Sequence, residues 1–344
     1  MSQPSGLAYQ MGRIMRSIPS GSFARLSSLQ ALWRAYHACR KGKRRQPRMA
    51  AFDLDADRHV CALNRMLTAG RYQPEPWQLR VIRDPKTRLI AAPSIRDRIV
   101  HRALIDEMGP HYERRFIDQS YTGGIGRGPH RAVLQYLRWL RQYRYRVELD
   151  IRRYFPSIHH PTLCELLFKP LRDARTQALI QQLLASSRQV YDTPLAMQVL
   201  QLDRDSLGAT CGLALGSYLS QWCGTFYLDG LDHMVKRELK IKGYLRYMDD
   251  FALFGDDPAE LINARAAIAA WLAEQRRLQL HPKRWDVMPN THASVFLGYR
   301  VSRAGVSPSR KLRRAMKRRL RTAANKGHEA LVRSVTSYRG LLLF

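Results

Sequence analysis

Two adjacent carboxylates, Asp249 and Asp250, lie between two mostly apolar or aromatic runs, residues 244–247 and 251–254. Runs of this kind, bounded by glycines, predict two strands of a β-hairpin with the acidic pair at its tip. Adjacent carboxylates on a rigid turn repel each other unless a cation lies beside them, and divalent-metal phosphoryl transfer uses that arrangement. The alternative is a solvated turn, because Asp is a favoured turn residue on its own account.

The surrounding elements must position this pair. Residues 147–151 alternate as a strand that ends in a sharp turn, so Asp150 lies at a strand end. Residues 79–82 and 88–92 predict a basic hairpin. The helical pattern predicts helices over 29–36, 54–69 with Gly70 as the C-cap, 129–140, 163–168, 175–184, from 219 onward, after the N-cap Asp257, and 310–321.

The composition indicates a polyanionic partner. The 344 residues include 58 Lys and Arg against 28 Asp and Glu, a net charge of +30 that exceeds what solubility needs. A membrane-surface or merely solvated protein is the alternative, but no apolar run nears the roughly 18 residues of a membrane span. Residues 1–20 lack an apolar signal region, so we expect a cytoplasmic protein without membrane association.

The five cysteines are odd in number, scattered and without Cys-x-x-Cys spacing. This usage argues against a disulfide framework and against a zinc site. The 45% hydrophobic content predicts a packed core that needs neither.

Two segments concentrate basic residues. Residues 40–45 form a dense cluster beside Trp33 and Tyr36, which is either solvated charge or a grip on nucleic-acid phosphates. Residues 310–321 carry eight Lys or Arg in twelve positions around apolar residues spaced four apart. That spacing predicts an amphipathic basic helix.

The tetrapeptide Tyr247-Met248-Asp249-Asp250 resembles the catalytic signature of reverse transcriptases. Residues 93–104 and 119–132 resemble the first two conserved blocks of the bacterial retroelement enzymes, in the same order. The resemblance implies an α+β right-hand polymerase with fingers, a palm of antiparallel sheet backed by helices, and a short helical thumb. It also implies two Mg²⁺ ions, with Mn²⁺ as an alternative, held by Asp150, the backbone of Ile151, Asp249 and Asp250.

The same resemblance assigns residues to the incoming deoxynucleotide. The triphosphate would meet Arg88, Arg96 and Arg98, for which water-facing arginines are the alternative. Phe155 matches a steric gate that crowds a ribose 2′-hydroxyl, although an isolated Phe is more often a core residue. Lys283 would protonate the pyrophosphate leaving group, with ordinary surface charge as the alternative.

The segment from Leu215 to Gln221 has the form Gly-x-x-x-Ser-Gln, where most reverse transcriptases carry Gln-Gly and a later Ser-Pro. This form resembles the enzymes of diversity-generating retroelements, in which it accompanies poor copying of adenines. In the family this loop contacts the templating base pair, so the resemblance implies that Leu215, Gly216 and Gln221 are further dNTP-binding residues and that Leu215 and Gly216 are candidate fidelity residues.

Contacts to primer and template are also implied by the resemblance. A primer-grip hairpin would turn at Gly298, and the 310–321 helix would face the duplex as a thumb. The residues expected to bind primer or template are Arg127, Tyr247, Met248, Gly298, Tyr299, Arg313, Arg314, Lys317 and Arg318.

We therefore expect a loosely ordered arm over 1–28, fingers within 29–142, a palm over 143–305 and a short basic thumb over 306–344, with no RNase H, maturase or endonuclease domain. The expected function is RNA-directed DNA synthesis from a dedicated RNA, error-prone at adenines in a diversity-generating retroelement. A defence or retron-type reverse transcriptase is the first alternative, and a non-catalytic RNA scaffold is the second. The expected partners are an RNA template, an RNA/DNA hybrid, dNTPs and a small basic helical accessory protein that forms an oligomer.

Overall fold

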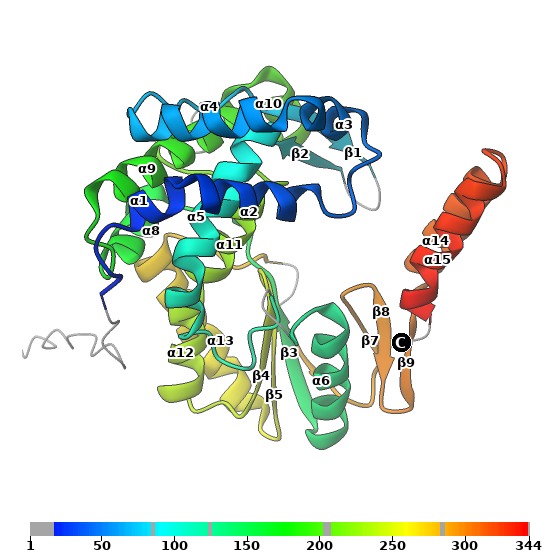
Figure 1. The fold of residues 1–344 in the computed structure, drawn as a ribbon. Helices are drawn as coiled ribbons and strands as arrows, with labels where there is room; N and C mark the ends of the chain where they lie inside the picture. Colours follow the sequence, from blue (N-terminus) through cyan, green and yellow to red (C-terminus); the bar gives the residue numbers. More distant parts are fainter. Residues whose placement is uncertain (1–16, 84–86, 123–125, 202–207, 283–285, 343–344) are drawn as a thin grey trace, which may run out of the picture.

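A four-stranded antiparallel sheet lies at the centre of the chain, with strand order β4-β5-β3-β6 (Figure 1). The computed structural model describes residues 17–83, 87–122, 126–201, 208–282 and 286–342. The predicted hairpin is confirmed: its strands pair from Gly243↔Phe254 to Tyr247↔Asp250. The four strands are β3 (Tyr145–Leu149), β4 (Gly243–Tyr247), β5 (Asp250–Gly255) and β6 (Val287–Pro289).

Both faces of this sheet are covered by helices, which explains why its strands are apolar on both sides. Phe251 and Leu253 belong to the core shared with helices α12 (Asp229–Arg237) and α13 (Pro258–Arg276). Ala252 and Phe254, which point the other way, pack with α6 (Pro129–Gln142). Figure 1 shows α6 opposite α12 and α13 across the sheet.

The helical part of the molecule packs around α5 (Ile95–Glu113), which contacts α1, α2 and α11. A second, two-stranded sheet lies at its edge, made of β1 (Gln78–Ile82) and β2 (Arg88–Ala92), as predicted. The helices are α1 (Ser22–Ser27), α2 (Leu29–Arg40), α3 (Pro47–Leu54), α4 (Ala56–Thr68), α7 (Tyr154–Ser157), α8 (His160–Phe168), α9 (Ala174–Gln189), α10 (Pro194–Leu200) and α11 (Tyr218–Tyr227), with a 3₁₀ turn η1 (Val190–Asp192).

The prediction of a loosely ordered arm over residues 1–28 is wrong for residues 17–28, the part that the structure describes. Ile18, Phe23 and Leu26 are buried, and the Ile18 amide donates to the carbonyl of Pro170 at 2.8 Å. The guanidinium of Arg175 stacks 4.1 Å from the Phe23 ring centroid. These three apolar residues are widely spaced among Ser and Gly, so the sequence pattern hid their burial; residues 1–16 lie outside the described chain.

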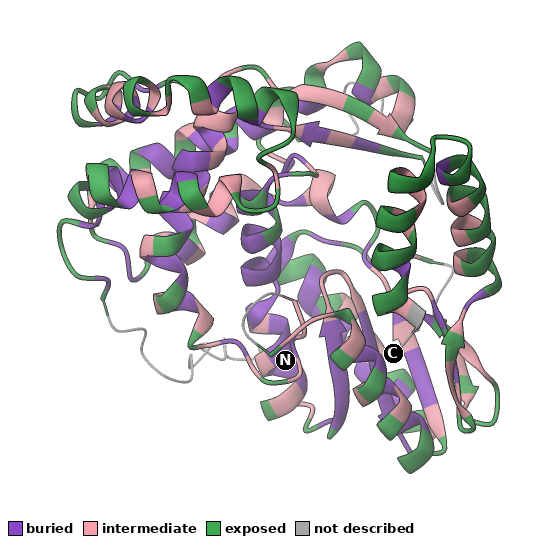
Figure 2. Cartoon of the chain, turned by 45° about the vertical axis from the view of Figure 1, so that its right-hand side comes forward, coloured by how far each residue is buried: buried purple, intermediate pink, exposed green. Residues whose placement is uncertain are grey.

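The C-terminal region consists of a three-stranded sheet followed by a helical pair (Figures 1 and 2). The predicted basic helix is confirmed as α14, and it packs against α15, which the sequence pattern did not predict. Most residues of both helices are exposed (Figure 2). The elements are β7 (Ser294–Phe296), β8 (Tyr299–Ser302), β9 (Gly305–Pro308), α14 (Arg310–Ala324) and α15 (His328–Leu342).

None of the helices in the described ranges combines the length and the apolar composition that a membrane crossing requires.

Candidate active site

The register of the central sheet brings Asp150 to the acidic turn. Strand β3 pairs with β5 from Tyr145↔Gly255 to Leu149↔Phe251. The next residue, Asp150, therefore reaches the level of Asp250, which closes the β4–β5 hairpin opposite Tyr247. Two carboxylates a hundred positions apart in sequence thus meet at one end of the sheet, beside Asp249.

The other two carboxylates act electrostatically on Asp249. Burial, followed by the negative charges of Asp250 and Asp150, raises the pKa of Asp249 from 3.8 to about 7. The positive charge of Arg88 acts in the opposite direction, which puts this arginine of β2 within interaction range. The site is therefore an acidic cluster that a nearby cation would stabilise.

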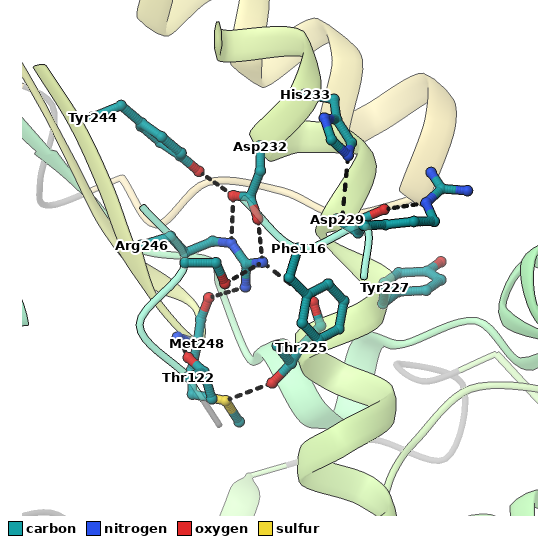
Figure 3. Close-up of polar contacts among 12 residues, drawn as sticks. Phe116, Thr122, Thr225, Tyr227, Asp229, Asp232, His233, Tyr244, Arg246 and Met248 are labelled. Atoms are coloured by element: carbon teal, nitrogen blue, oxygen red, sulfur yellow. Dashed lines mark hydrogen bonds and ion pairs between the residues drawn. The ribbon is translucent and has the colours of Figure 1, made fainter. Parts of the chain in front are cut away.

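The acidic turn has an uncommon backbone. Met248, which directly precedes Asp249, has φ 58°, in the left-handed region that costs a non-glycine residue roughly 1–2 kcal/mol. Its amide donates to Oγ1 of Thr122 at 2.6 Å, and its carbonyl accepts from Nη1 of Arg246 at 3.1 Å. Figure 3 shows both contacts, together with a longer one at 3.5 Å from the Thr225 hydroxyl to the Met248 sulfur.

Arg246 connects the turn to a buried ion pair. Its Nε and Nη2 lie 2.7 and 2.5 Å from the two carboxylate oxygens of Asp232 on α12, and both side chains are 0% exposed. Asp232 also accepts from the Tyr244 hydroxyl at 2.7 Å. A buried charge pair in this bidentate geometry fixes the guanidinium rigidly, so Arg246 holds the Met248 carbonyl in one place (Figure 3).

The segment before Thr122 is fixed to the same strand. The Arg246 amide donates to the Gln119 carbonyl at 2.9 Å, and the Tyr121 amide donates to the Arg246 carbonyl at 2.8 Å. Arg246 Nη2 also contacts the Ser120 hydroxyl at 3.3 Å. This pairing places Thr122 under the turn.

The roles of Arg246, Asp232 and Thr122 were not predicted from the sequence. One signal was present: Arg246 is a charged residue inside an otherwise apolar strand, and Arg is almost never fully buried unless it is paired. Nothing in the sequence identified Asp232 or Thr122 as its partners.

The three predicted triphosphate-binding arginines have different surroundings. Arg88 is exposed and acts on Asp249. Arg96 donates to Glu75 at 2.6 Å and points away toward Met66 on α4. Arg98 donates through Nε to the Pro93 carbonyl at 3.0 Å and lines a pocket beside α11. Of the three, Arg88 is therefore the one whose charge acts on Asp249, and its contact with a triphosphate stays a prediction.

Phe155 lies close to helix α11. Its ring is half-buried, 5.5 Å from the ring of Tyr154, and a Cβ added at Gly224 would lie 3.5 Å from it. Tyr154 is buried, and the charge of Asp249 contributes to raising its pKa. Phe155 therefore sits next to a residue that borders the acidic cluster, and its role as a steric gate stays a prediction.

The loop before α11 packs against β2. The Leu215 carbonyl accepts from the Ala91 amide at 2.7 Å, and Gly216 has φ 126°. A Cβ at Gly216 would lie 2.7 Å from the Ala91 carbonyl oxygen, so only glycine fits there. Gln221 is exposed one turn into the helix.

The hairpin predicted to turn at Gly298 is confirmed, with Leu297 and Gly298 at positive φ in its two-residue turn, and its role as a primer grip stays a prediction. Tyr299, however, is only 3% exposed, and its hydroxyl lies 3.0 Å from Nε2 of His130 on α6. Tyr299 thus packs inward, where it is poorly placed to touch a primer.

The remaining predicted residues have different surroundings. Arg127 donates to the Phe116 carbonyl at 3.3 Å, and Tyr247 is half-buried against the α6 core. Ile151 is buried and is bridged to Leu280. Lys283 lies outside the described residues, and the exposed thumb cations are Arg313, Arg314, Lys317 and Arg318 on α14.

The donor set suits a hard divalent cation, because three carboxylates supply only oxygen ligands. Among the described residues, no three His, Cys, Asp or Glu side chains are already arranged as metal ligands. The fit therefore rests on the shared negative charge around Asp249, where a bound cation would replace the repulsion between carboxylates.

Residues 82–301 match the family described as reverse transcriptase (RNA-dependent DNA polymerase). This match spans more than half of the chain, and the chain belongs to that family. Its fold is the α+β right-hand polymerase with fingers, palm and thumb.

Individual relatives are more distant. The chain is 25% identical to Protein YkfC of Escherichia coli (strain K12) over 268 residues, 69% of each chain. It is similar to apo telomerase from Candida Tropicalis, with a TM-score of 0.46, 11% identity, and coverage of 69% of this chain and 49% of that chain. It is also similar to telomerase from Candida albicans in complex with a TWJ fragment of telomeric RNA, with a TM-score of 0.43, 12% identity, and coverage of 78% and 53%. The chain thus spans about half the length of these telomerase chains.

Proposed function

We propose that the chain is an RNA-directed DNA polymerase that extends a primer 3′ end with deoxynucleotides. The observation that carries the proposal is the sheet register, which puts Asp150 level with Asp250 beside Asp249 in a member of the reverse transcriptase family. A chain that served only as an RNA scaffold would have no use for three carboxylates that repel one another at a strained turn.

The carboxylates would hold two Mg²⁺ ions, or Mn²⁺, with the Ile151 carbonyl as a further ligand. When bound, the ions supply the charge that activates the primer hydroxyl and stabilises the pyrophosphate. The raised pKa of Asp249 supports this assignment, since a group disfavoured as an isolated anion gains most from a neighbouring cation.

Other residues of this chain orient the substrates. Arg88, near the carboxylates, would neutralise part of the triphosphate, and Phe155 would exclude the ribose 2′-hydroxyl. Arg246 and Thr122 hold the backbone of the acidic turn from below, so the carboxylates are fixed before substrate binds. Such preorganisation accounts for a large share of enzymatic rate enhancement.

The template would be RNA, held by charge and duplex shape. The net charge of +30 and the four exposed thumb cations support binding to the phosphates of an RNA/DNA hybrid. The sequence of the template would then be read by base pairing.

For the biological role, we propose mutagenic copying of a dedicated RNA in a diversity-generating retroelement. The Gly216-x-x-x-Ser220-Gln221 form favours this class, together with a small basic helical accessory protein as a partner. A defence or retron-type enzyme shares the chemistry and differs in what is copied.

Sequencing of the RNA and cDNA that co-purify with the wild-type protein and with Asp249→Asn tests the role. We expect cDNA from one RNA, with changes concentrated at template adenines, in the wild type alone. Faithful or repetitive cDNA would replace the retroelement role with defence, and bound RNA without cDNA in either protein would contradict the polymerase.

A further inference from the structure

A basic pocket of about 400 Å³ lies between α2, α5 and the start of α11. Its lining includes Lys43, Arg98 and Arg102, and none of the described residues that line it is an Asp or Glu. Burial raises the pKa of Cys39, another lining residue, and the positive charges of all three cations act to lower it. Asp106, which pairs with Arg102 at 2.7 Å, acts in the opposite direction, so Lys43 and Arg98 supply most of the positive charge. A pocket with this charge favours an anionic group, and its volume lies within the range of small-ligand sites.

The pocket also offers groups suited to a base and a sugar. Tyr218 is 46% exposed, and the Arg102 guanidinium lies 5.4 Å from the centroid of its ring. His101 lines the pocket and is 2% exposed, and its Nδ1 has no hydrogen-bond partner among the described residues. A buried polar atom of this kind is costly unless a ligand or water satisfies it.

Helix α11 connects this pocket to the acidic turn. Tyr218 and Gln221 line the pocket, and the Thr225 hydroxyl donates to the Gln221 carbonyl at 3.0 Å. Thr225 in turn contacts both Met248 and Arg246. Gln221 and Thr225 are four positions apart on α11, a rise of about 6 Å along the helix. This rise corresponds to roughly two nucleotide steps at about 3.4 Å each.

We infer that this pocket binds an unpaired nucleotide of the template strand, one or two positions ahead of the templating base. Its phosphate lies against Lys43 and Arg98 at the N-terminal end of α11, where the helix dipole also favours negative charge. Its base packs on Tyr218, and the His101 and Gln221 side chains contact its polar edge. This inference rests on the proposed function, because it requires a template strand at the acidic turn.

Binding measurements with the Asp249→Asn protein test the pocket without depending on catalysis. Fluorescence anisotropy compares two primer–template duplexes, one with a single unpaired template nucleotide and one with four. Stacking on an aromatic side chain contributes about 1–3 kcal/mol per base, so we expect the longer overhang to bind about tenfold more tightly.

Matched variants test whether the pocket causes the tighter binding of the longer overhang. Tyr218→Leu removes the aromatic face and Lys43→Gln removes a lining charge, so each should reduce the ratio of the two affinities. Tyr218→Phe keeps the ring, and Lys41→Gln removes a neighbouring charge that does not line the pocket, so both should keep the ratio. Thermal unfolding midpoints verify that all four variants fold.

Three results would overturn the inference. The first is equal affinity of the Asp249→Asn protein for both overhangs, and the second is an unchanged ratio in Tyr218→Leu combined with Lys43→Gln. The third is tight binding of AMP to the nucleic-acid-free protein without any overhang effect, which would assign the pocket to a free nucleotide. Failure of the proposed function is seen separately, as a wild-type protein that does not extend a primer.

Discussion

Asp232 is the acceptor at the centre of the buried network behind the acidic turn, and Asp232→Asn perturbs that network with little change in volume. In the native protein, Asp232 accepts from Arg246 at 2.5 and 2.7 Å and from Tyr244 at 2.7 Å, with no exposure of its side chain. The substitution removes its negative charge and leaves the Arg246 guanidinium buried without a counter-ion.

The magnitude follows from that burial. Breaking a buried ion pair from one side costs about 3–5 kcal/mol, a large share of a total stability of roughly 5–15 kcal/mol. We expect urea unfolding to show a loss of this size for Asp232→Asn. Glu165→Gln is the control, because it removes an exposed pair with Lys169 at 3.6 Å, for which we expect less than about 1 kcal/mol.

A double variant separates stability from positioning. Asp232→Leu with Arg246→Met replaces the buried pair by apolar side chains, which often restores most of the lost stability. It cannot restore the hydrogen bond to the Met248 carbonyl. Because misplacement of a catalytic group by about 1 Å costs on the order of a hundredfold in rate, we expect the double variant to be stable and to have a kcat for primer extension at least tenfold below that of the wild type.

Two results would refute this reasoning. If Asp232→Asn lost no more stability than Glu165→Gln, the Asp232–Arg246 ion pair would not contribute substantially to the free energy of unfolding. If the double variant extended primers at the wild-type rate, Arg246 would not position the turn.

Three further predictions concern other parts of the molecule. First, because the pKa of Asp249 is raised to about 7, the metal-free folded state binds more protons than the unfolded state between about pH 4 and 7, and stability falls as pH rises. With partial solvent screening, Asp249→Asn should therefore be more stable than the wild type by ~1–2 kcal/mol at pH 8 in EDTA, shrinking toward pH 4; equal stability at pH 8 would contradict this. Second, Gly216→Ala should lose about 2–4 kcal/mol in urea unfolding, because its Cβ would lie 2.7 Å from the Ala91 oxygen. Gly340→Ala, in open space within α15, should gain about 0.5–1 kcal/mol, and equal effects would refute the packing argument. Third, neutralising four thumb cations should reduce the slope of log affinity for an RNA/DNA hybrid against log salt by about 3. The residues to change are Arg313, Arg314, Lys317 and Arg318. An unchanged slope would show that these cations are only solvated surface charge.

The hairpin that carries the acidic turn could be predicted from the sequence because its pattern is local. Apolar strands on both sides of Asp249 and Asp250 specify a turn, and the family signature adds Asp150. The register that brings Asp150 into place depends on pairing between β3 and β5, which only the folded sheet shows.

The supporting network could not be predicted, because its contacts are long-range. Arg246 is visible as a charge in an apolar strand, but Ser120 lies 126 positions away and Asp232 lies on a separate helix. The same limit applies to Tyr299: the turn at Gly298 was predicted from the family resemblance, whereas the inward direction of the tyrosine depends on His130 of α6.

Primer extension on an RNA template in Mg²⁺, with dNTPs, tests the central claim most directly. The proteins to compare are the wild type, Asp249→Asn, and Asp256→Asn, a control that changes an exposed Asp at the opposite end of β5. The account predicts DNA products from the wild type and from Asp256→Asn, and none from Asp249→Asn. Extension by Asp249→Asn at the wild-type rate, or no extension by any of the three, would contradict the assignment of the acidic turn as a polymerase active site.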